Sequence, residues 1–237
     1  MEEKKERINK YLSRAGYCSR RQADALLEEG RVTVDGHKAQ MGEKVSTGQA
    51  VCVDGIPVTP VEEKVLLVFN KPKGIVCTTG HYEGNVIDYI NYPVRIYPIG
   101  RLDKDSTGLL LLTNQGDLVN AILKASNYHE KEYVVTVDKD LTRDFLDHMR
   151  EGVPILDTVT RKCRVWATGR RTFRIILTQG LNRQIRRMCE ALGYRVRELE
   201  RIRVMNITLD GLETGKYRDA TPAEWEGLEK LLRQNGD

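Results

Sequence analysis

The segment Gly100–Asn114, with the sequence GRLDKDSTGLLLLTN, holds the residue types best suited to chemistry. It places Arg101 two residues before Asp103, and four consecutive leucines follow shortly after. A carboxylate beside apolar residues can act as a nucleophile or a general base, provided that a cation keeps it ionised. The same residues are compatible with a simple turn, in which Asp103 caps a bend and Arg101 lies on the surface.

A calcium-binding loop is another reading of this segment, because Asp103, Asp105, Thr107 and Gly108 match the first half of such a loop. The loop requires a bidentate glutamate at its twelfth position. Here the twelfth residue is Asn114, and leucines occupy the seventh to tenth positions. The segment is therefore not expected to bind calcium.

An arginine-rich segment, GLNRQIRRMCEALG, spans residues 180–193 and predicts a helix. Its apolar residues at helical spacing should face the core; they are Ile185, Met188 and Leu192. This orientation places Arg183 and Arg187 along one edge of the helix and Arg186 on a neighbouring edge. The arginines either form a solvated basic face or bind phosphate, with one guanidinium pairing with a buried carboxylate to keep it ionised.

Three further residues are weak candidates when each is considered alone. Tyr133 begins a predicted strand, where a tyrosine usually packs against the core, and Lys71 and Lys73 lie in a Lys-Pro-Lys-Gly turn. The sequence contains no dinucleotide-binding glycine pattern, no phosphate-binding P-loop, no H-E-x-x-H motif and no G-x-S-x-G elbow. The common nucleotide-dependent enzymes, zinc proteases and serine hydrolases are thus not indicated.

Composition indicates a globular protein, because hydrophobic residues make up 40% of the chain and charged residues 30%. No apolar run approaches the roughly 20 residues that span a bilayer, and the charged N-terminus, MEEKKER, lacks the apolar stretch of a signal peptide. The five cysteines are scattered and form no C-x-x-C pair. This pattern predicts reduced thiols in a cytoplasmic protein rather than disulfides or a zinc ribbon.

Positive charge is concentrated in two parts of the chain. Between Arg161 and Arg203, 13 Lys and Arg residues occur with three acidic residues, a net of +10 in a chain whose total is +4. A second basic cluster lies between Arg7 and Arg21. Two such clusters favour a polyanionic partner, because cations that bind phosphates release condensed counterions.

The N-terminal part predicts a disordered tail over residues 1–6 and a small α+β unit over residues 7–54. Two helices are expected between residues 7 and 29, and Ser19 with Gln22 forms a capping-box pattern at the start of the second. Short β segments follow, each ending in an Asp-Gly turn signal. Residues 55–63 contain two prolines and little periodicity, which predicts a linker.

Residues 64–237 predict a larger unit in which strands and helices mix without regular alternation. The expected strands are rich in β-branched or aromatic residues and span Val65–Phe69, Tyr133–Val137, Cys163–Ala167, Phe173–Thr178 and Arg203–Leu209. The expected helices span Asp117–Lys124, Leu141–Arg150, Asn182–Leu192 and Thr221–Arg233. The fold class is therefore α+β, with a mixed, mostly antiparallel sheet flanked by helices in the larger unit.

Taken together, these segments resemble the pseudouridine synthases of the RsuA/RluB/RluE/RluF group, and their residues are most similar to those of the RluF branch. Residues 7–54 resemble an S4 RNA-binding domain, while NKPKGIVCTT, GRLDKDSTGLLLLTN, KEYVVTV and GLNRQIRRMCEALGY resemble successive motifs of the catalytic domain. The resemblance covers nearly the whole chain, and no motif position departs from it. It implies an S4 domain, a linker, a catalytic domain over residues 64–237, and an activity that needs neither metal nor organic cofactor.

The resemblance also implies roles for individual residues. Asp103 resembles the catalytic aspartate, Arg101 the arginine that helps displace the target base, Tyr133 the tyrosine that stacks on the flipped uracil, Arg186 the basic partner of the aspartate, and Leu177 the aliphatic floor of the pocket, with Ile176 as the alternative. The aspartate can attack C1′ of the ribose or assist glycal formation by taking the 2′ proton. The sequence leaves both routes open.

RNA is the partner that the resemblance implies. The expected RNA contacts come from Arg14, Arg20 and Arg21 in the S4 domain, and from Lys71, Lys73, Arg183 and Arg187 in the catalytic domain. The RluF branch suggests a uridine of large-subunit (23S) ribosomal RNA, with a tRNA anticodon-loop uridine as a second target. A cytoplasmic monomer without metal or membrane contacts is expected.

Two other functions remain open at this point. A non-catalytic S4 RNA-binding factor for ribosome assembly would also carry the basic clusters, although it would not need Arg101, Asp103, Tyr133 and Arg186 together. A metal-dependent nuclease is weakly indicated, because only Asp103 and Asp105 cluster.

Overall fold

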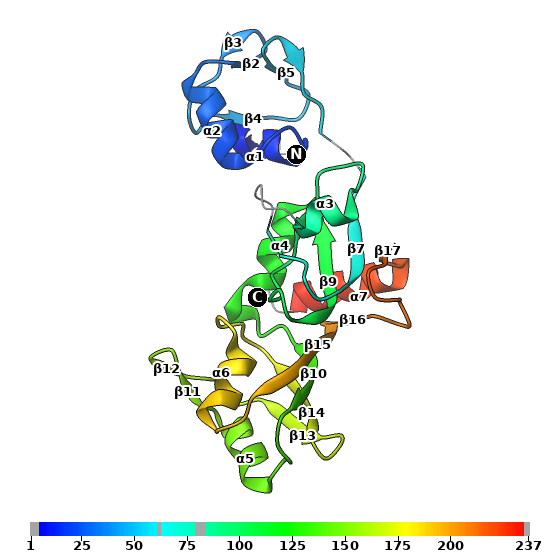
Figure 1. The fold of residues 1–237 in the computed structure, drawn as a ribbon. Coiled ribbons are helices and arrows are strands. Elements are labelled where there is room, and N and C mark those ends of the chain that lie inside the picture. Colours follow the sequence, from blue (N-terminus) through cyan, green and yellow to red (C-terminus); the bar gives the residue numbers. More distant parts are fainter. Residues whose placement is uncertain (1–4, 61–62, 79–83, 235–237) are drawn as a thin grey trace. The chain divides into compact units, whose positions relative to one another are not determined.

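The computed structural model describes residues 5–60, 63–78 and 84–234. The chain forms two compact units (Figure 1), one comprising Met1–Lys64 with the short segments Pro93–Arg95 and Asn114–Gly116, and the other comprising the remainder. Within the described ranges, no helix is both long enough and apolar enough to span a membrane.

The first unit packs two helices against short antiparallel strands. The helices are α1 (Ile8–Arg14) and α2 (Arg20–Glu28), and the four-stranded sheet has the order β3 (His37–Lys38), β2 (Val32–Val34), β5 (Val51–Val53) and β6 (Ile56–Pro57). The predicted capping box at the start of α2 is confirmed, because the backbone N–H of Gln22 donates to Ser19 Oγ at 3.2 Å and the Gln22 side chain accepts from the Ser19 N–H at 2.9 Å.

Two boundaries of this unit differ from the sequence prediction. The disordered tail was expected to include Glu6, but Glu6 lies in β1 (Glu6–Arg7), which pairs with β4 (Lys44–Val45); residues 1–4 of that tail lie outside the described residues. The linker was expected to begin at residue 55, but β6 forms there, and Val58 is only 8% exposed. The Asp-Gly turn folds the chain back, so that β6 pairs with β5 and forms the edge strand of the sheet. An edge strand tolerates the missing N–H of the proline in β6.

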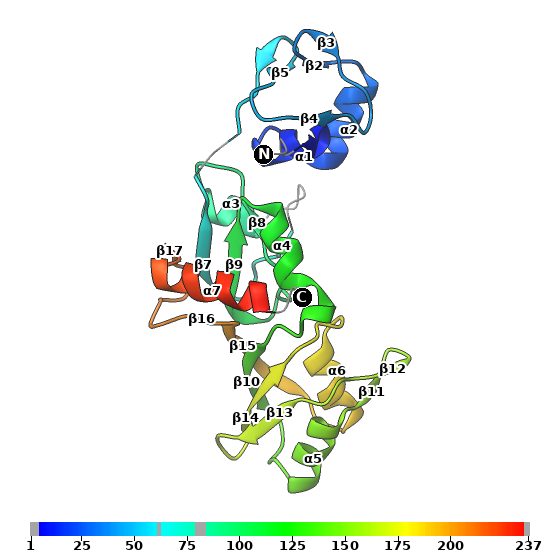
Figure 2. The same cartoon turned by 180° about the vertical axis from the view of Figure 1, so that it is seen from behind.

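A seven-strand path forms the main sheet of the second unit (Figures 1 and 2). Its order is β13 (Arg164–Ala167), β14 (Thr172–Leu177), β10 (Lys131–Val137), β15 (Val196–Val204), β9 (Thr107–Thr113), β7 (Leu66–Lys71) and β17 (Tyr217–Asp219); β16 (Ile207–Thr208) pairs with β15, and β8 (Tyr97–Pro98) with β9. Among the described strand pairs of this sheet, only β9 with β15 is parallel. The predicted mixed, mostly antiparallel sheet is confirmed.

Helices lie against the sheet, as Figures 1 and 2 show from opposite sides. They cover two hydrophobic cores. Helices α5 (Arg143–Glu151) and α6 (Gln184–Ala191) bury Phe145 and Met188 against β10, β14 and β15. Helices α4 (Gly116–Leu123) and α7 (Pro222–Gln234) bury Leu118 and Leu228 against β7 and β9. The remaining elements are α3 (Val86–Ile90), the 3-10 turn Ala125–Asn127, and the hairpin of β11 (Pro154–Ile155) and β12 (Thr158–Val159).

The predicted strand Arg203–Leu209 is wrong in its boundaries. Strand β15 starts at Val196 and ends at Val204, and β16 follows after a turn in which Met205 has a left-handed φ of 52°. The start of β15 was not predicted because its sequence, VRELERIRV, is highly charged and resembles a loop. In the structure, several of these charged side chains instead pair with residues on neighbouring strands.

Candidate active site

Asp103 lies on the loop between β8 and β9, and hydrogen bonds hold this loop in place. The Ser106 N–H donates to the Asp103 carbonyl at 3.0 Å, and the Gly74 N–H donates to the Lys104 carbonyl at 2.9 Å. The Leu102 N–H donates to Cys77 Sγ at 3.4 Å. The carboxylate is thus presented by a loop whose backbone is bound to the segment that follows β7.

Lys71 was predicted to bind RNA, and the structure shows that this is wrong. Its side chain is 0% exposed. The ammonium donates to the carbonyls of Pro72 at 2.9 Å, Ser106 at 2.8 Å and Lys104 at 3.4 Å. Burial lowers the pKa of Lys71, and the negative charge of Asp103 is among the groups that oppose this effect. Lys71 therefore supports the Asp103 loop from inside the protein, where RNA cannot reach it.

Replacing Lys71 by methionine is expected to lower the free energy of unfolding by about 1–3 kcal/mol, because buried carbonyl groups lose a charged donor. Urea unfolding measures this loss. Lys73→Met is the matched control, since Lys73 lies in the same turn but is exposed, and it should change stability by no more than about 0.5 kcal/mol. Equal stability of the two variants would contradict the supporting role of Lys71.

Two guanidinium groups face the carboxylate of Asp103. Arg183 Nη1 lies 3.4 Å and Arg186 Nε 3.6 Å from Asp103 Oδ2. Arg186 also donates from Nη2 to Ser106 Oγ at 3.2 Å. The Arg186 side chain is 14% exposed and that of Arg183 is 43% exposed, while that of Asp103 is 29% exposed. Arg186 is therefore the more enclosed partner, and Arg183 closes the site from the solvent side.

The start of α6 places both arginines at Asp103. Arg183 is the N-cap residue and has a left-handed φ of 50°, a conformation that is uncommon for a residue other than glycine. Arg183 was predicted to contact RNA, and the family resemblance paired only Arg186 with the carboxylate. The left-handed cap turns Arg183 toward Asp103 as well. Arg187, also assigned to RNA, instead donates to both oxygens of Asn182, at 3.1 and 3.2 Å.

A narrow pocket of about 90 Å³ adjoins the carboxylate. It is lined by Asp103, Arg101, Tyr133, Leu177 and Arg183, among others. It opens beside a wider cleft of about 930 Å³ that shares Arg101, Asp103, Tyr133 and Arg183. The narrow part is too small for more than a single base, whereas the wide part can hold a longer segment of chain.

Leu177 and Ile176 were the alternatives for the floor of the pocket. Leu177 lines the narrow pocket, and Ile176 is absent from the lining of both parts. The β10–β14 register explains this difference, because Ile176 lies opposite Glu132 and shares the sheet face that turns away from Tyr133. Gln184 also lines the pocket and is 4% exposed; it was not among the site residues predicted from the sequence.

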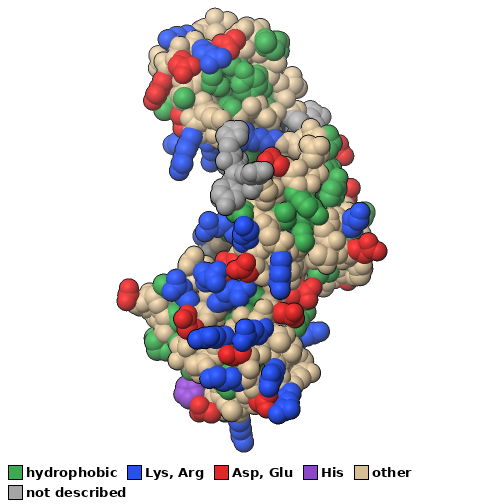
Figure 3. All heavy atoms as spheres, in the orientation of Figure 1, with side chains coloured by type: hydrophobic (Ala, Val, Ile, Leu, Met, Phe, Trp, Pro, Cys, Tyr) green, Lys and Arg blue, Asp and Glu red, His purple; other side chains and the backbone are tan. Residues whose placement is uncertain are grey.

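The candidate RNA-binding residues of the first unit lie on its helices. Arg20 and Arg21 are exposed in the first turn of α2, where the helix dipole disfavours cations. Arg14 donates to Glu6 Oε1 and stacks over the Tyr11 ring, 5.6 Å from its centroid. Figure 3 shows that Lys and Arg side chains also gather over the part of the second unit that contains α5, α6 and β10, with acidic side chains among them.

The sequence model for RNA pseudouridylate synthases matches residues 65–191, which is more than half of the chain. The chain belongs to the RNA pseudouridylate synthase family. The S4 domain model matches residues 6–51 of this synthase.

Relatives of the synthase extend the match to nearly the full chain. It is 53% identical over 232 residues to the dual-specificity RNA pseudouridine synthase RluF of Escherichia coli strain K12, over 97% of this chain and 80% of that protein. It is 35% identical over 236 residues to the ribosomal large subunit pseudouridine synthase B of Bacillus subtilis strain 168, over 95% of this chain and 96% of that protein. A crystal structure of a pseudouridylate synthase aligns with a TM-score of 0.70 and 27% identity, over 94% of this chain and 99% of that one.

These matches confirm the resemblance to the RluF group and the combination of an S4 domain with a synthase fold. The synthase is an RNA-modifying enzyme, so the alternative of a non-catalytic RNA-binding factor is wrong. Across the described part of the chain, no three His, Cys, Asp or Glu side chains are placed to hold a metal ion. All five cysteines are free, and burial raises the pKa of Cys189 to about 12, which leaves its thiol protonated.

Proposed function

We propose that this synthase converts a uridine of large-subunit ribosomal RNA to pseudouridine, with Asp103 as the catalytic carboxylate. One observation carries the assignment of Asp103: among the described residues it is the only acidic side chain that lines either part of the cleft. Two guanidinium groups lie within 3.6 Å of this carboxylate and face its negative charge. An ionised carboxylate is the form that can attack C1′ or take the 2′ proton.

The reaction breaks the N1–C1′ bond, rotates the uracil and joins C5 to C1′, while a proton leaves C5 and N1 gains one. The target uridine first leaves its stack, which costs a few kcal/mol. Arg101, exposed at the cleft, fills the vacated space in this proposal, and the uracil enters the narrow pocket. Tyr133 stacks on the detached ring, and Leu177 forms the floor beneath it, so the ring rotates without diffusing away.

The RNA target of this proposal rests on the relatives. A ribosomal large subunit synthase at 35% identity supports large-subunit ribosomal RNA, and a dual-specificity relative at 53% identity supports a second RNA, for which we propose a tRNA anticodon-loop uridine. We further propose that the enzyme acts as a monomer in the cytoplasm. Pseudouridine mapping in RNA from cells with and without the gene tests the targets, and an unchanged ribosomal RNA would contradict the first of them.

The double variant Arg20→Glu with Arg21→Glu is expected to bind substrate RNA more weakly and with less salt dependence. Each lost phosphate contact lowers the slope of log affinity against log salt by about 0.7–0.9, so two contacts lower it by about 1.4–1.8. Binding titrations at several salt concentrations measure the slope. The pair Lys230→Glu with Arg233→Glu on α7 changes the net charge equally and is the control. Equal slopes for the two double variants would contradict RNA binding by α2.

A further inference from the structure

Among the described residues, no acidic side chain forms an ion pair with the two cations, Arg201 and Lys131, that line the wide cleft beside the narrow pocket. Arg201 on β15 is 3% exposed, and its Nε donates to the Leu109 carbonyl at 2.7 Å. Its Nη2 is buried and has no hydrogen-bond partner among the described residues. Lys131 on β10 lines the same cleft, and in the described part of the chain it forms no ion pair; its ammonium makes only a 3.4 Å contact with the His129 carbonyl.

Strand register places these two cations directly beside the proposed uracil pocket. Tyr133 pairs with Arg201 across β10 and β15, so their side chains share one sheet face. Lys131 lies on that face two residues before Tyr133, about 6.6 Å along the strand. Tyr133 lines both parts of the cleft, but Lys131 and Arg201 line only the wide part. The cations therefore border the space next to the base pocket rather than the base itself.

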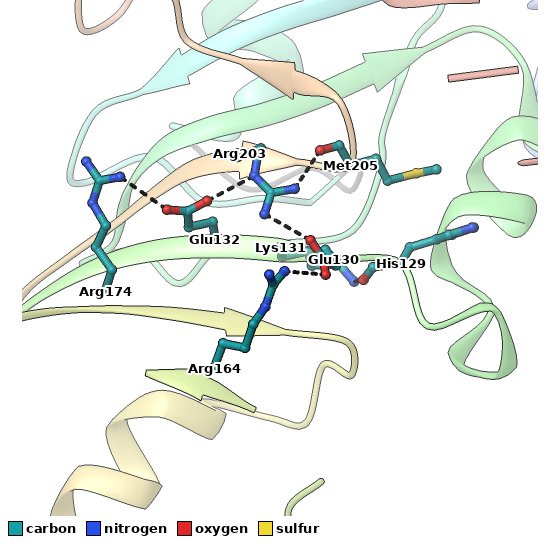
Figure 4. Close-up of polar contacts among 8 residues, drawn as sticks. All are labelled: His129, Glu130, Lys131, Glu132, Arg164, Arg174, Arg203 and Met205. Atoms are coloured by element: carbon teal, nitrogen blue, oxygen red, sulfur yellow. Dashed lines mark hydrogen bonds and ion pairs between the residues drawn. The ribbon is translucent and has the colours of Figure 1, made fainter. Parts of the chain in front are cut away.

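The acidic neighbours of Lys131 in sequence point to the opposite face of the sheet, where they are already paired (Figure 4). Glu132 accepts from Arg203 at 2.9 Å and from Arg174 at 3.3 Å. Glu130 accepts from Arg203 at 3.1 Å and from Arg164 at 2.5 Å. Neither glutamate can reach the cleft without breaking this network. Among the described residues, neither acidic neighbour of Lys131 is thus available to it, and the charge of Lys131 and Arg201 can pair with a group that enters from outside.

An anion in this position would relieve an electrostatic cost that the protein otherwise bears. Burial lowers the pKa of Lys131 to about 8, and the positive charge of Arg201 contributes to this shift. Asp103, the one acid that lines the wide cleft among the described residues, already faces Arg183 and Arg186. The buried Arg201 and the half-buried Lys131, which have no counter-charge among the described residues, are unfavourably placed unless a ligand supplies one.

We propose that Lys131 binds one phosphodiester group of the RNA, next to the uridine that occupies the narrow pocket, and that Arg201 strengthens this site from below through its positive charge. The proposal rests on the proposed function, because it takes the narrow pocket as the uracil site. The ligand is a phosphate because the RNA backbone is the anionic part of the substrate and must continue from the pocket into the wide cleft. Arg201 acts through its charge, since its unpaired nitrogen lies below the surface.

Single methylphosphonate groups, which remove one backbone charge at a time, test the site. The probe is a stem-loop of large-subunit ribosomal RNA that carries the mapped uridine, modified in turn at each phosphate around it. Binding is measured in the Asp103→Asn background, so that substrate is not consumed. One position flanking the target should weaken binding about tenfold or more, the effect of losing a charge-assisted hydrogen bond.

The variant Lys131→Met should bind the unmodified RNA more weakly by a similar factor. Its affinity should no longer depend on the methylphosphonate at that one position, while the effects at the other positions remain. Lys131→Arg should restore part of the sensitivity, and Lys139→Met, two residues beyond the end of β10, should keep all of it. Lys131→Met should also melt at the same or a higher temperature, because it removes a half-buried cation. A structural role would instead lower the melting temperature and leave the phosphate profile unchanged.

The proposal would be overturned if methylphosphonates weakened the binding of Lys131→Met at every position as much as they do without this substitution. Unchanged affinity of Lys131→Met for unmodified RNA would also overturn it. Failure of the proposed function gives a different result, since Asp103→Asn would then still form pseudouridine. The methylphosphonate profile measures binding alone and is read independently of turnover.

Discussion

Asp103→Asn is expected to bind substrate RNA with nearly unchanged affinity and to lose at least about 10⁴-fold in turnover, as loss of an essential catalytic side chain does in other enzymes. Asparagine has almost the same shape as aspartate, but its neutral amide can neither attack C1′ nor take the 2′ proton. The guanidinium groups of Arg183 and Arg186, at 3.4 and 3.6 Å from the carboxylate, would face an uncharged group. The pocket would therefore keep the shape that binds RNA but would no longer catalyse the reaction.

Release of tritium from RNA labelled at uracil C5 measures turnover, and a gel-shift titration measures binding. Asp105→Asn is the matched control, because Asp105 lies on the same loop but is exposed and outside the cleft lining. It should retain turnover within a few-fold of the unaltered enzyme. Pseudouridine formed by Asp103→Asn at an appreciable rate would remove Asp103 from the mechanism, and equal losses in both variants would point to damage of the loop as a whole.

Gly108→Ala is expected to lower the free energy of unfolding by about 3–5 kcal/mol, from the strain of a left-handed backbone together with steric overlap. Gly108 has a φ of +97° and pairs with Arg201 in the parallel β9–β15 ladder. A Cβ atom there would lie 2.3 Å from the Arg201 carbonyl oxygen and 2.8 Å from its nitrogen. Both are backbone atoms of a central strand, so neither can move aside cheaply.

Denaturant unfolding of Gly108→Ala should be compared with that of Gly211→Ala. Gly211 has a φ of +79°, but a Cβ there meets nothing within 4 Å, so this control carries the backbone strain of about 1–2 kcal/mol without the overlap. Turnover by Gly108→Ala should fall as well, because Asp103 lies five residues before the disrupted pair. Equal stability losses in the two variants would show that contact with β15 is not what requires a glycine.

Local patterns in the sequence predicted several features correctly. Ser19 and Gln22 form the expected capping box, because that motif depends on residues three apart. The arginine-rich segment forms a helix whose inward face carries Ile185 and Met188, as periodicity predicts. By contrast, β9 was not recognised as a strand: its leucines are buried throughout and show no alternation that separates a central strand from a buried helix.

The sequence by itself determined the family, the α+β class and the set of charged residues from which the site is built. Only the tertiary structure decided how these residues are used. Lys71 appeared to be a surface cation until folding placed carbonyls from residues 33 and 35 positions away around its ammonium. Arg183 reached Asp103 through a left-handed cap that no residue spacing indicates. The physical reason is that the environment of a charge is set by groups distant along the chain, which meet only when the sheet and its helices pack together.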